Sequence, residues 1–261
     1  MTVPASLVKE LRDQTGAGMM DSKRALEEAG GDLDRAKQIL REKGMAAAGK
    51  RASRTTPEGL VGYRIADGVG TMVAVGCESE PVAQNEEFQR FAEDVLNAVE
   101  RDGPEAAAEL EDERTALVAR IGENIRVVGA TRMEAGDGDV LAAYVHPPAN
   151  KIGSIVKARG GNEELAREVA MHLAFARPQY VRRDQVPNEE TERERETLSR
   201  QEDVLSKPEQ VRDRIVEGRL QKWYADFVLL EQPWYRGTGN SVAEEIGDME
   251  VLDFAVYALG R

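Results

Sequence analysis

The sequence predicts an α+β protein with an N-terminal three-helix bundle, two units that each combine helices with a small antiparallel sheet, and a helical arm inserted in the second unit. Three observations lead to this prediction. Apolar residues recur at helical spacing over residues 6–44, strand-like alternation begins at Leu60, and a charged segment at residues 188–201 has almost no apolar residues. A chain of 261 residues suits two or three such modules, each with its own small core.

Composition excludes several classes of function. A net charge of −13 makes a surface that repels phosphate backbones and anionic lipids, so we expect no binding of nucleic acid or membranes. A single cysteine, Cys77, rules out an intramolecular disulfide framework and fits a reducing compartment. His146 and His172 lack ligand-type neighbours at metal-binding spacing, and we expect neither a metal nor another cofactor. The first residues show no basic start followed by an apolar stretch, so we expect a cytoplasmic location.

Residues 1–54 are expected to form a helical module and the start of a linker. Glycine-rich turns at Gly16-Ala17-Gly18 and Gly30-Gly31-Asp32 separate three short helices. Gly44 should end the third helix, because the apolar stripe is lost from Met45 to Pro57. The pattern resembles a ubiquitin-associated (UBA) type three-helix bundle, which implies a small docking module.

Residues 55–139 are expected to form the first α+β unit. The dipeptide Asp67-Gly68 joins two apolar alternating runs and predicts a β-hairpin. The expected elements of this unit are strands at Leu60–Ile65 and Thr71–Cys77, helices at Glu86–Val99 and Glu105–Arg120, and a third strand at Ile125–Met133.

Residues 140–180 and 226–261 are expected to form the second α+β unit. Gly160-Gly161-Asn162 should start a helix that covers the sheet and ends near Pro178. The expected strands are Val140–His146, Ile152–Lys157, Phe227–Glu231 and Val251–Tyr257.

Residues 181–225 interrupt this second unit. The run from Asn188 to Gln201 consists largely of Glu and Arg and cannot build a globular core. After Ser206-Lys207-Pro208, apolar residues return at helical spacing from Val211 to Trp223. Two antiparallel helices, forming a coiled-coil arm, explain this pattern. A partly disordered acidic insertion is the alternative.

One acidic, proline-containing turn stands out, which we call the corner (residues 76–88). It follows an apolar strand and precedes a helix, so it should be rigid and exposed, with Ser79, Glu80, Pro81 and Val82 at its tip. Cys77, at the end of the strand, fits a small buried residue better than a nucleophile. The sequence also lacks the glycine-rich phosphate-binding motifs, so we expect neither nucleotide binding by this chain nor covalent catalysis.

Several motifs resemble those of the bacterial elongation factor Ts family, over about residues 6–257. The N-terminal ones are Leu7-Val8-Lys9-Glu10-Leu11-Arg12, Thr15-Gly16-Ala17-Gly18-Met19-Met20-Asp21, Lys23 and Ala25-Leu26-Glu27-Glu28-Ala29-Gly30-Gly31-Asp32. Later ones, in the same order as in the family, include Ile121-Gly122-Glu123-Asn124-Ile125, Lys151-Ile152-Gly153, Ala170-Met171-His172, Val216-Glu217-Gly218-Arg219-Leu220 and Leu230-Glu231-Gln232-Pro233.

The resemblance implies a guanine nucleotide exchange factor that binds elongation factor Tu, both GDP-bound and nucleotide-free, and promotes GDP release during translation elongation. It also implies the residues that contact Tu. Those on the bundle are Leu11, Arg12, Met19, Met20 and Lys23, although Leu11 and Met20 fit equally well as bundle core. His146 and Tyr235 are implied contacts of the second unit, with a hydrogen-bonded loop histidine as the alternative for His146. The sequence leaves a homodimer open.

The corner departs from the family pattern. The family usually has Thr-Asp-Phe where this chain has Ser79-Glu80-Pro81, and proline cannot fill an aromatic-sized pocket. The alternative function is therefore a protein that binds a GTPase without strong exchange activity. The resemblance also leads us to expect no carboxyl-terminal extension of the kind that longer family members carry after the position of Arg261.

Overall fold

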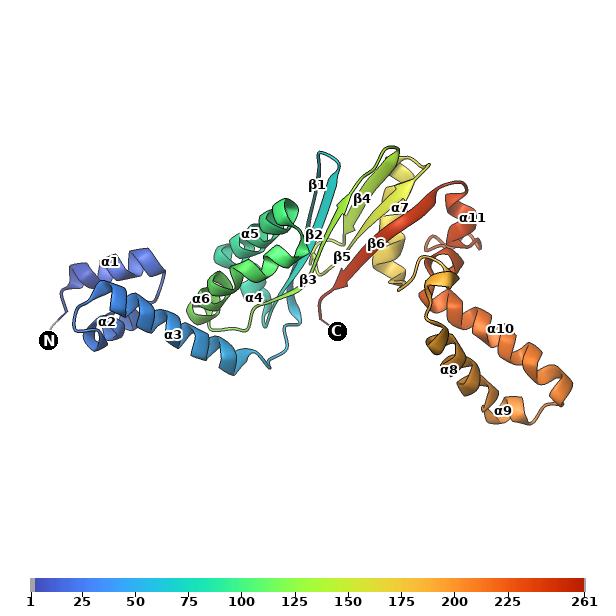
Figure 1. Cartoon of the computed structure of the whole chain (residues 1–261), viewed down its shortest axis with the longest axis horizontal. Coiled ribbons are helices and arrows are strands. Elements are labelled where there is room, and N and C mark those ends of the chain that lie inside the picture. Colours follow the sequence, from blue (N-terminus) through green and yellow to red (C-terminus); the bar gives the residue numbers. More distant parts are fainter. Residues whose placement is uncertain (1–2, 261) are drawn as a thin grey trace.

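Two three-stranded antiparallel sheets confirm the predicted α+β class, with strand orders β1-β2-β3 and β4-β5-β6. The structure is a computed structural model that describes residues 3–260. Figure 1 shows the sheets at the centre, the N-terminal bundle at one end and the arm at the other. The strands are β1 (Glu58–Ala66), β2 (Val69–Cys77), β3 (Arg126–Glu134), β4 (Asp139–Val145), β5 (Ile152–Arg159) and β6 (Glu250–Ala258).

The predicted hairpin turn between the first two strands is confirmed. Asp67 and Gly68 both have positive φ angles, 50° and 75°, as a two-residue turn with the twist of the flanking strands requires. The turn sets a register in which Glu58 lies opposite Cys77 at the far end of the hairpin. The end of β2 is therefore fixed relative to the start of β1.

The two sheets pack against each other through an apolar layer. Its buried members are Val61, Met72, Ala74, Met133, Ala143, Ile155 and Leu259. Glycines allow the close approach, because a Cβ at Gly129 would lie 2.2 Å from the Tyr257 ring and one at Gly153 would lie 2.7 Å from Val61. The Tyr257 hydroxyl also bonds to Thr131, which ties β6 to β3 across the layer.

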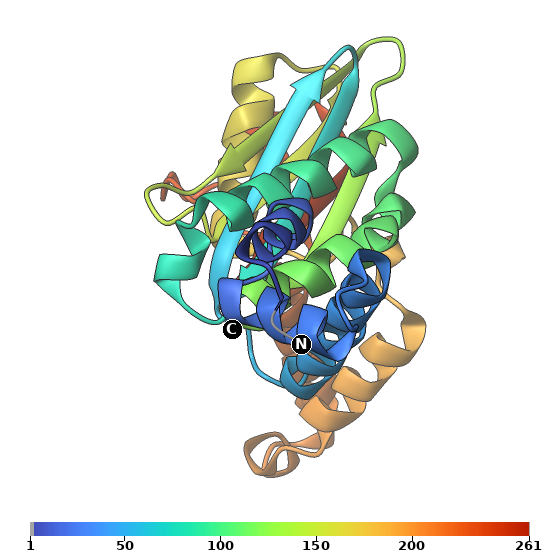
Figure 2. The same cartoon turned by 90° about the vertical axis from the view of Figure 1, so that its left-hand side faces the viewer.

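Helices cover the outer faces of both sheets. Figure 2, seen from the bundle end, shows α5 and α6 lying across the first sheet. The covering elements are α5 (Glu86–Asp102), the 3-10 turn η1 (Pro104–Leu110), α6 (Glu111–Ile121) and, on the second sheet, α7 (Glu163–Ala176). The single helix expected from Glu105 to Arg120 is wrong, since Pro104 starts a tight 3-10 segment and α6 begins at Glu111, where acidic residues stabilise a helix N-terminus.

The N-terminal bundle has the three expected helices, α1 (Ala5–Thr15), α2 (Met19–Glu28) and α3 (Leu33–Arg51). Its core consists of Val8, Leu11, Ala25, Leu26, Ala36 and Ile39. Asp32 caps α3 as predicted, because its carboxylate accepts a hydrogen bond of 3.0 Å from the Arg35 amide.

The predicted end of the third helix at Gly44 is wrong. The helix α3 continues to Arg51, so much of the expected linker from Met45 to Pro57 is helical. Gly44 is buried against α6, and a Cβ there would meet Ala119 at 3.6 Å. This tertiary contact, together with the helix-forming alanines that follow, outweighs the helix-breaking tendency of glycine.

The arm contains α8 (Asn188–Ser199), the short α9 (Glu202–Leu205) and α10 (Glu209–Phe227), with α8 and α10 running antiparallel (Figure 1). A small core holds them together and consists of Leu198, Val204, Val216 and Leu220. No helix within residues 3–260 combines the length and the apolar character needed to cross a bilayer.

The strand expected at Phe227–Glu231 is wrong. Phe227 ends α10, and Leu229–Glu231 form the 3-10 turn η3. The Leu229 amide donates to the Tyr180 carbonyl over 2.8 Å, and only Val228 makes a single parallel bridge. Leu229 is fully buried in the core of the second unit, so the apolar run reflects a buried turn rather than a strand. The short α11 (Val242–Ile246) packs on the same core.

His172 belongs to this second core. The ring is fully buried, stacks on Trp234 with a centroid distance of 5.3 Å, and places Nε2 2.9 Å from Gln232 Oε1. Burial lowers the pKa of His172 below its ordinary value, and the hydrogen bond with Gln232 opposes this only in part. The neutral ring is therefore the form that suits the folded protein.

We expect His172 to make stability depend on pH. Its lowered pKa means that stability present above about pH 6.5 is lost as the pH falls further, because the unfolded chain binds the proton more readily. Between pH 7.5 and 5.5, urea unfolding should show that wild type loses more free energy of unfolding than His172→Gln. Equal pH dependence in wild type and His172→Gln would contradict this role.

Candidate functional site

The corner is an exposed helical turn between β2 and α5. The turn α4 (Glu80–Ala83) follows Ser79, and Pro81 occupies an early position where a helix needs no backbone donor. Glu80 and Pro81 are exposed, whereas Val82 packs on the first core. Asn85 closes the corner, because its side chain accepts a hydrogen bond of 2.8 Å from the Glu87 amide at the start of α5.

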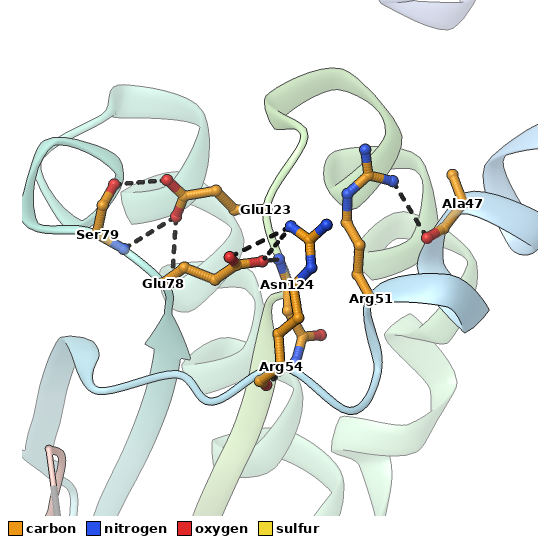
Figure 3. A network of polar contacts seen from close by, with 7 residues as sticks. All are labelled: Ala47, Arg51, Arg54, Glu78, Ser79, Glu123 and Asn124. Carbon is orange, nitrogen blue, oxygen red and sulfur yellow. Dashed lines mark hydrogen bonds and ion pairs between the residues drawn. The ribbon is translucent and has the colours of Figure 1, made fainter.

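Glu123, on the turn between α6 and β3, holds the start of the corner (Figure 3). Its carboxylate accepts hydrogen bonds from the Glu78 amide at 3.1 Å, the Ser79 amide at 3.0 Å and the Ser79 hydroxyl at 2.5 Å. The Glu78 carboxylate in turn accepts a hydrogen bond of 2.6 Å from the Asn124 amide. Glu78 and Ser79, at the start of the corner, therefore bind Glu123 and Asn124, after α6, and each pair supplies one of the accepting carboxylates.

The segment that follows α3 joins the same network. The Arg54 guanidinium lies 3.4 Å from the Glu78 carboxylate, and the Arg54 carbonyl accepts a hydrogen bond of 2.7 Å from the Asn124 side-chain amide. Asn124 is 1% exposed. Figure 3 also shows Arg51, at the end of α3, which donates to the Ala47 carbonyl over 3.1 Å. The corner is thus connected to the helix that carries the bundle.

Cys77 is a buried structural residue, as the sequence predicted. It is fully buried, and its thiol donates to the Ser79 carbonyl over 3.3 Å. Burial, reinforced by the charge of Glu123, raises the pKa of Cys77 to about 12. A thiol of this kind is not a nucleophile at neutral pH.

The residues predicted as contacts on the bundle fall into two groups. Met19 and Met20, at the start of α2, are 50% and 60% exposed, which excludes Met20 from the bundle core. The side chains of Arg12 and Lys23 are also largely exposed and make only surface ion pairs, which contribute little to stability. Leu11, in contrast, is fully buried and lies in the bundle core.

His146 lies on the loop at the end of the sheets where β2 ends. It is exposed on the loop between β4 and β5, with Nδ1 2.9 Å from the Tyr144 hydroxyl. Lys151, at the other end of this loop, pairs with Glu58 over 2.8 Å, and Glu58 lies opposite Cys77 in the first sheet. The structure therefore brings the His146 loop and the corner to the same end of the two sheets.

Tyr235 lies on the α7 side of the second sheet. Its ring is partly buried against Trp234, and its hydroxyl donates to Glu168 over 2.6 Å. Burial, together with this hydrogen bond, raises the pKa of Tyr235. Most of the Tyr235 ring packs against the second core, so only a small part of it is exposed for contact with a partner.

Sequence reasoning missed Glu123, Asn124 and Arg54 as parts of this site. Glu123 and Ser79 are 44 residues apart, and no local pattern joins them. The one available signal was the run Ile121-Gly122-Glu123-Asn124-Ile125, which has two polar residues directly before a strand.

Comparisons with known proteins decide the family. The model of the family described as "Elongation factor TS" matches residues 78–261. The chain belongs to the elongation factor Ts family. Elongation factor Ts of Aquifex aeolicus (strain VF5) is 40% identical over 289 residues, covering 100% of this chain and 99% of that protein. Elongation factor Ts of Thioalkalivibrio sulfidiphilus (strain HL-EbGR7) is 38% identical over 275 residues, covering 100% and 93%.

A third relative, elongation factor Ts of Escherichia coli O139:H28 (strain E24377A / ETEC), is 36% identical over 265 residues and covers 99% of this chain and 92% of that protein. The relatives match the bundle as well as the sheets, because the alignments extend over the whole chain. The resemblance found in the sequence motifs is therefore confirmed, and the protein is a translation elongation factor of this family.

Burial of Cys77 predicts a slow thiol reaction. At pH 8 a thiol with a pKa of about 12 holds about a thousandfold less thiolate than one at the ordinary value of 9.0. We expect native protein to react with a chromogenic disulfide reagent at least about a hundredfold more slowly than urea-unfolded protein. Ser53→Cys in a Cys77→Ala background supplies an exposed reference thiol on the same fold. Equal rates for Cys77 and this reference thiol would contradict the assignment.

Proposed function

We propose that the protein binds elongation factor Tu in its GDP-bound form and promotes the release of GDP. The main support is the corner, which presents Glu80 and Pro81 on an exposed turn whose base is fixed by Glu123. A rigid protrusion can bind a distorted partner without first losing conformational entropy of its own. This is the property that an exchange factor needs.

The mechanism is differential binding rather than covalent chemistry. A factor lowers the affinity of its partner for GDP only if it binds the nucleotide-free state more tightly than the loaded state. The coupling is reciprocal, so GDP must weaken the binding of this protein by the same factor. Exposed surfaces are sufficient for this task, and the inert thiol of Cys77 fits a site that works without a nucleophile.

The bundle provides the second contact with Tu in this proposal. Met19 and Met20 form an exposed apolar pair, and Arg12 and Lys23 are exposed charged residues of the same bundle. Methionine adapts its shape to a partner surface, and weak surface ion pairs exchange readily for intermolecular ones. We assign Leu11 the role of supporting this surface from the core. His146 adds a contact beside the corner.

Binding without strong exchange remains the second candidate, because of Pro81. The side chain is exposed at the place where the family usually has phenylalanine, and it is too small to fill an aromatic-sized pocket. An unfilled pocket forfeits about 1.5 to 3 kcal/mol, which is about ten- to a hundredfold in the stabilised state. A protein of this kind would form the complex with Tu and leave the rate of GDP release unchanged.

Stopped-flow release of a fluorescent GDP analogue from the matching Tu separates the two candidates. We expect release to accelerate with protein concentration and to saturate, and calorimetry to give tighter binding to nucleotide-free Tu than to Tu with GDP. The double variant Met19→Ala, Met20→Ala should need higher concentrations, whereas Met45→Ala, an equally exposed methionine on α3, should behave like wild type. No acceleration at saturating protein would refute exchange, and equal affinity for both forms of Tu would refute the mechanism.

The corner makes a prediction of its own. Pro81→Phe should increase GDP release from a Tu that has an aromatic-sized pocket by about ten- to a hundredfold at subsaturating protein, because the larger side chain fills the pocket. Pro81→Ala, which does not enlarge the side chain at this position, is the matched control. Slower release with Pro81→Phe than with wild type would show that the corner binds Tu in another way.

A further inference from the structure

We propose that Glu123 is the positioning residue of the corner: it orients the turn that carries Glu80 and Pro81 without touching the partner itself. This role rests on the proposed exchange function. Glu123 lies outside the corner in sequence, on the turn between α6 and β3, and its side chain is half-buried beneath the start of α4. Figure 3 shows its carboxylate facing Ser79 and the backbone of Glu78.

The first argument concerns backbone donors that lack other partners. The ladder between β1 and β2 ends with the pair Glu58 and Cys77, so the next two amides, of Glu78 and Ser79, receive no strand partner. They also precede α4, whose first amides have no acceptor within the helix. Both amides donate to one carboxylate oxygen of Glu123. Hydrogen bonds to an ionised carboxylate are among the stronger ones in proteins.

The second argument concerns the cap of α4. Serine before a helix normally accepts a hydrogen bond from one of the first helical amides. Ser79 occupies that position, but its side chain makes no such bond. Its hydroxyl instead donates to the other oxygen of Glu123 over 2.5 Å. The orientation of α4 therefore depends on Glu123 rather than on a cap of its own.

The third argument is that the Glu123 backbone is itself fixed. The next residue, Asn124, is almost completely buried, donates its amide to the Glu78 carboxylate, and uses its side chain to hold the Arg54 carbonyl. A carboxylate can position a neighbour only when its own main chain is immobile. The turn after α6 meets this condition, because Asn124 fixes the main chain directly after Glu123.

The substitution Glu123→Gln tests the proposal with little change in size. The glutamine oxygen can still accept from both amides and its NH₂ group can donate to the Ser79 hydroxyl, but the charge-assisted hydrogen bonds become neutral ones, which are about half as strong. At saturating protein we expect the maximal rate of GDP release to fall about tenfold, with a larger loss of affinity for nucleotide-free Tu than for Tu with GDP, because the corner acts on the emptied state. Ser79→Ala, which removes one bond and keeps both amide contacts, should lower the maximal rate about threefold.

Glu93→Gln is the matched control, since Glu93 is an exposed carboxylate on α5, outside the corner, that pairs with Arg64 over 3.7 Å. It should leave release unchanged. Circular dichroism and urea unfolding establish that each variant is folded before its rate is interpreted. A maximal rate for Glu123→Gln equal to that of wild type would overturn the positioning role while leaving the exchange function intact.

Amide hydrogen exchange gives a readout that does not depend on Tu. In the free protein the amides of Glu78 and Ser79 should be protected, and Glu123→Gln should reduce their protection at least about tenfold, with the amides of β2 unaffected. Rapid exchange at Glu78 and Ser79 in wild type would overturn the proposal. Protection that is lost in Glu123→Gln, combined with no acceleration of GDP release by wild type, would instead refute the exchange function alone.

Discussion

The close packing of the two sheets is the constraint on which the rest of the structure depends. Gly129 and Gly153 each lie where a side chain would collide with the opposite sheet, so the apolar layer between the sheets has a fixed and small thickness. This packing brings the loop after β4 beside the first strand, where the Val61 amide donates to the Asn150 carbonyl over 2.7 Å. Two surfaces from distant parts of the sequence thereby become one end of the molecule.

The chemistry at that end consists of hydrogen bonds rather than reactive groups. Three carboxylates there are used internally, with Glu78 and Glu123 accepting from backbone amides and Glu58 pairing with Lys151. The backbone that carries the exposed side chains of the corner is therefore well supported. Such an arrangement suits recognition of a partner surface, because little order has to be acquired on binding.

Local rules in the sequence predicted much of the fold. The dipeptide Asp67-Gly68 fixed a hairpin, and Asp32 marked the start of a helix, because both effects act over a few residues. The errors arose where distant contacts outweigh local ones. Gly44 lies inside a helix because it packs on α6, and the apolar run that ends at Glu231 is a buried turn.

The candidate site was predictable to the same degree. The exposed corner and the surface methionines follow from nearby residues, and the family resemblance drew attention to them. The contact between Glu123 and Ser79 spans 44 residues and depends on how α6 ends relative to β2, which no periodicity reports. The structure also shows that Leu11 is buried and Met20 is exposed, a difference between two apolar residues that the sequence did not reveal.

The unbroken helix α3 makes the bundle the end of a lever. Its 19 residues form a rod of about 28 Å, of which about 16 Å lies between Leu33 and Gly44, the glycine that packs on α6. Pivoting this rod by about ten degrees would displace its far end by about 3 Å, the length of a hydrogen bond. The position of the bundle, and of its exposed Met19 and Met20, thus depends on the small side chains that Gly44 packs against, Thr115 and Ala119. These lie far from the methionines in the sequence.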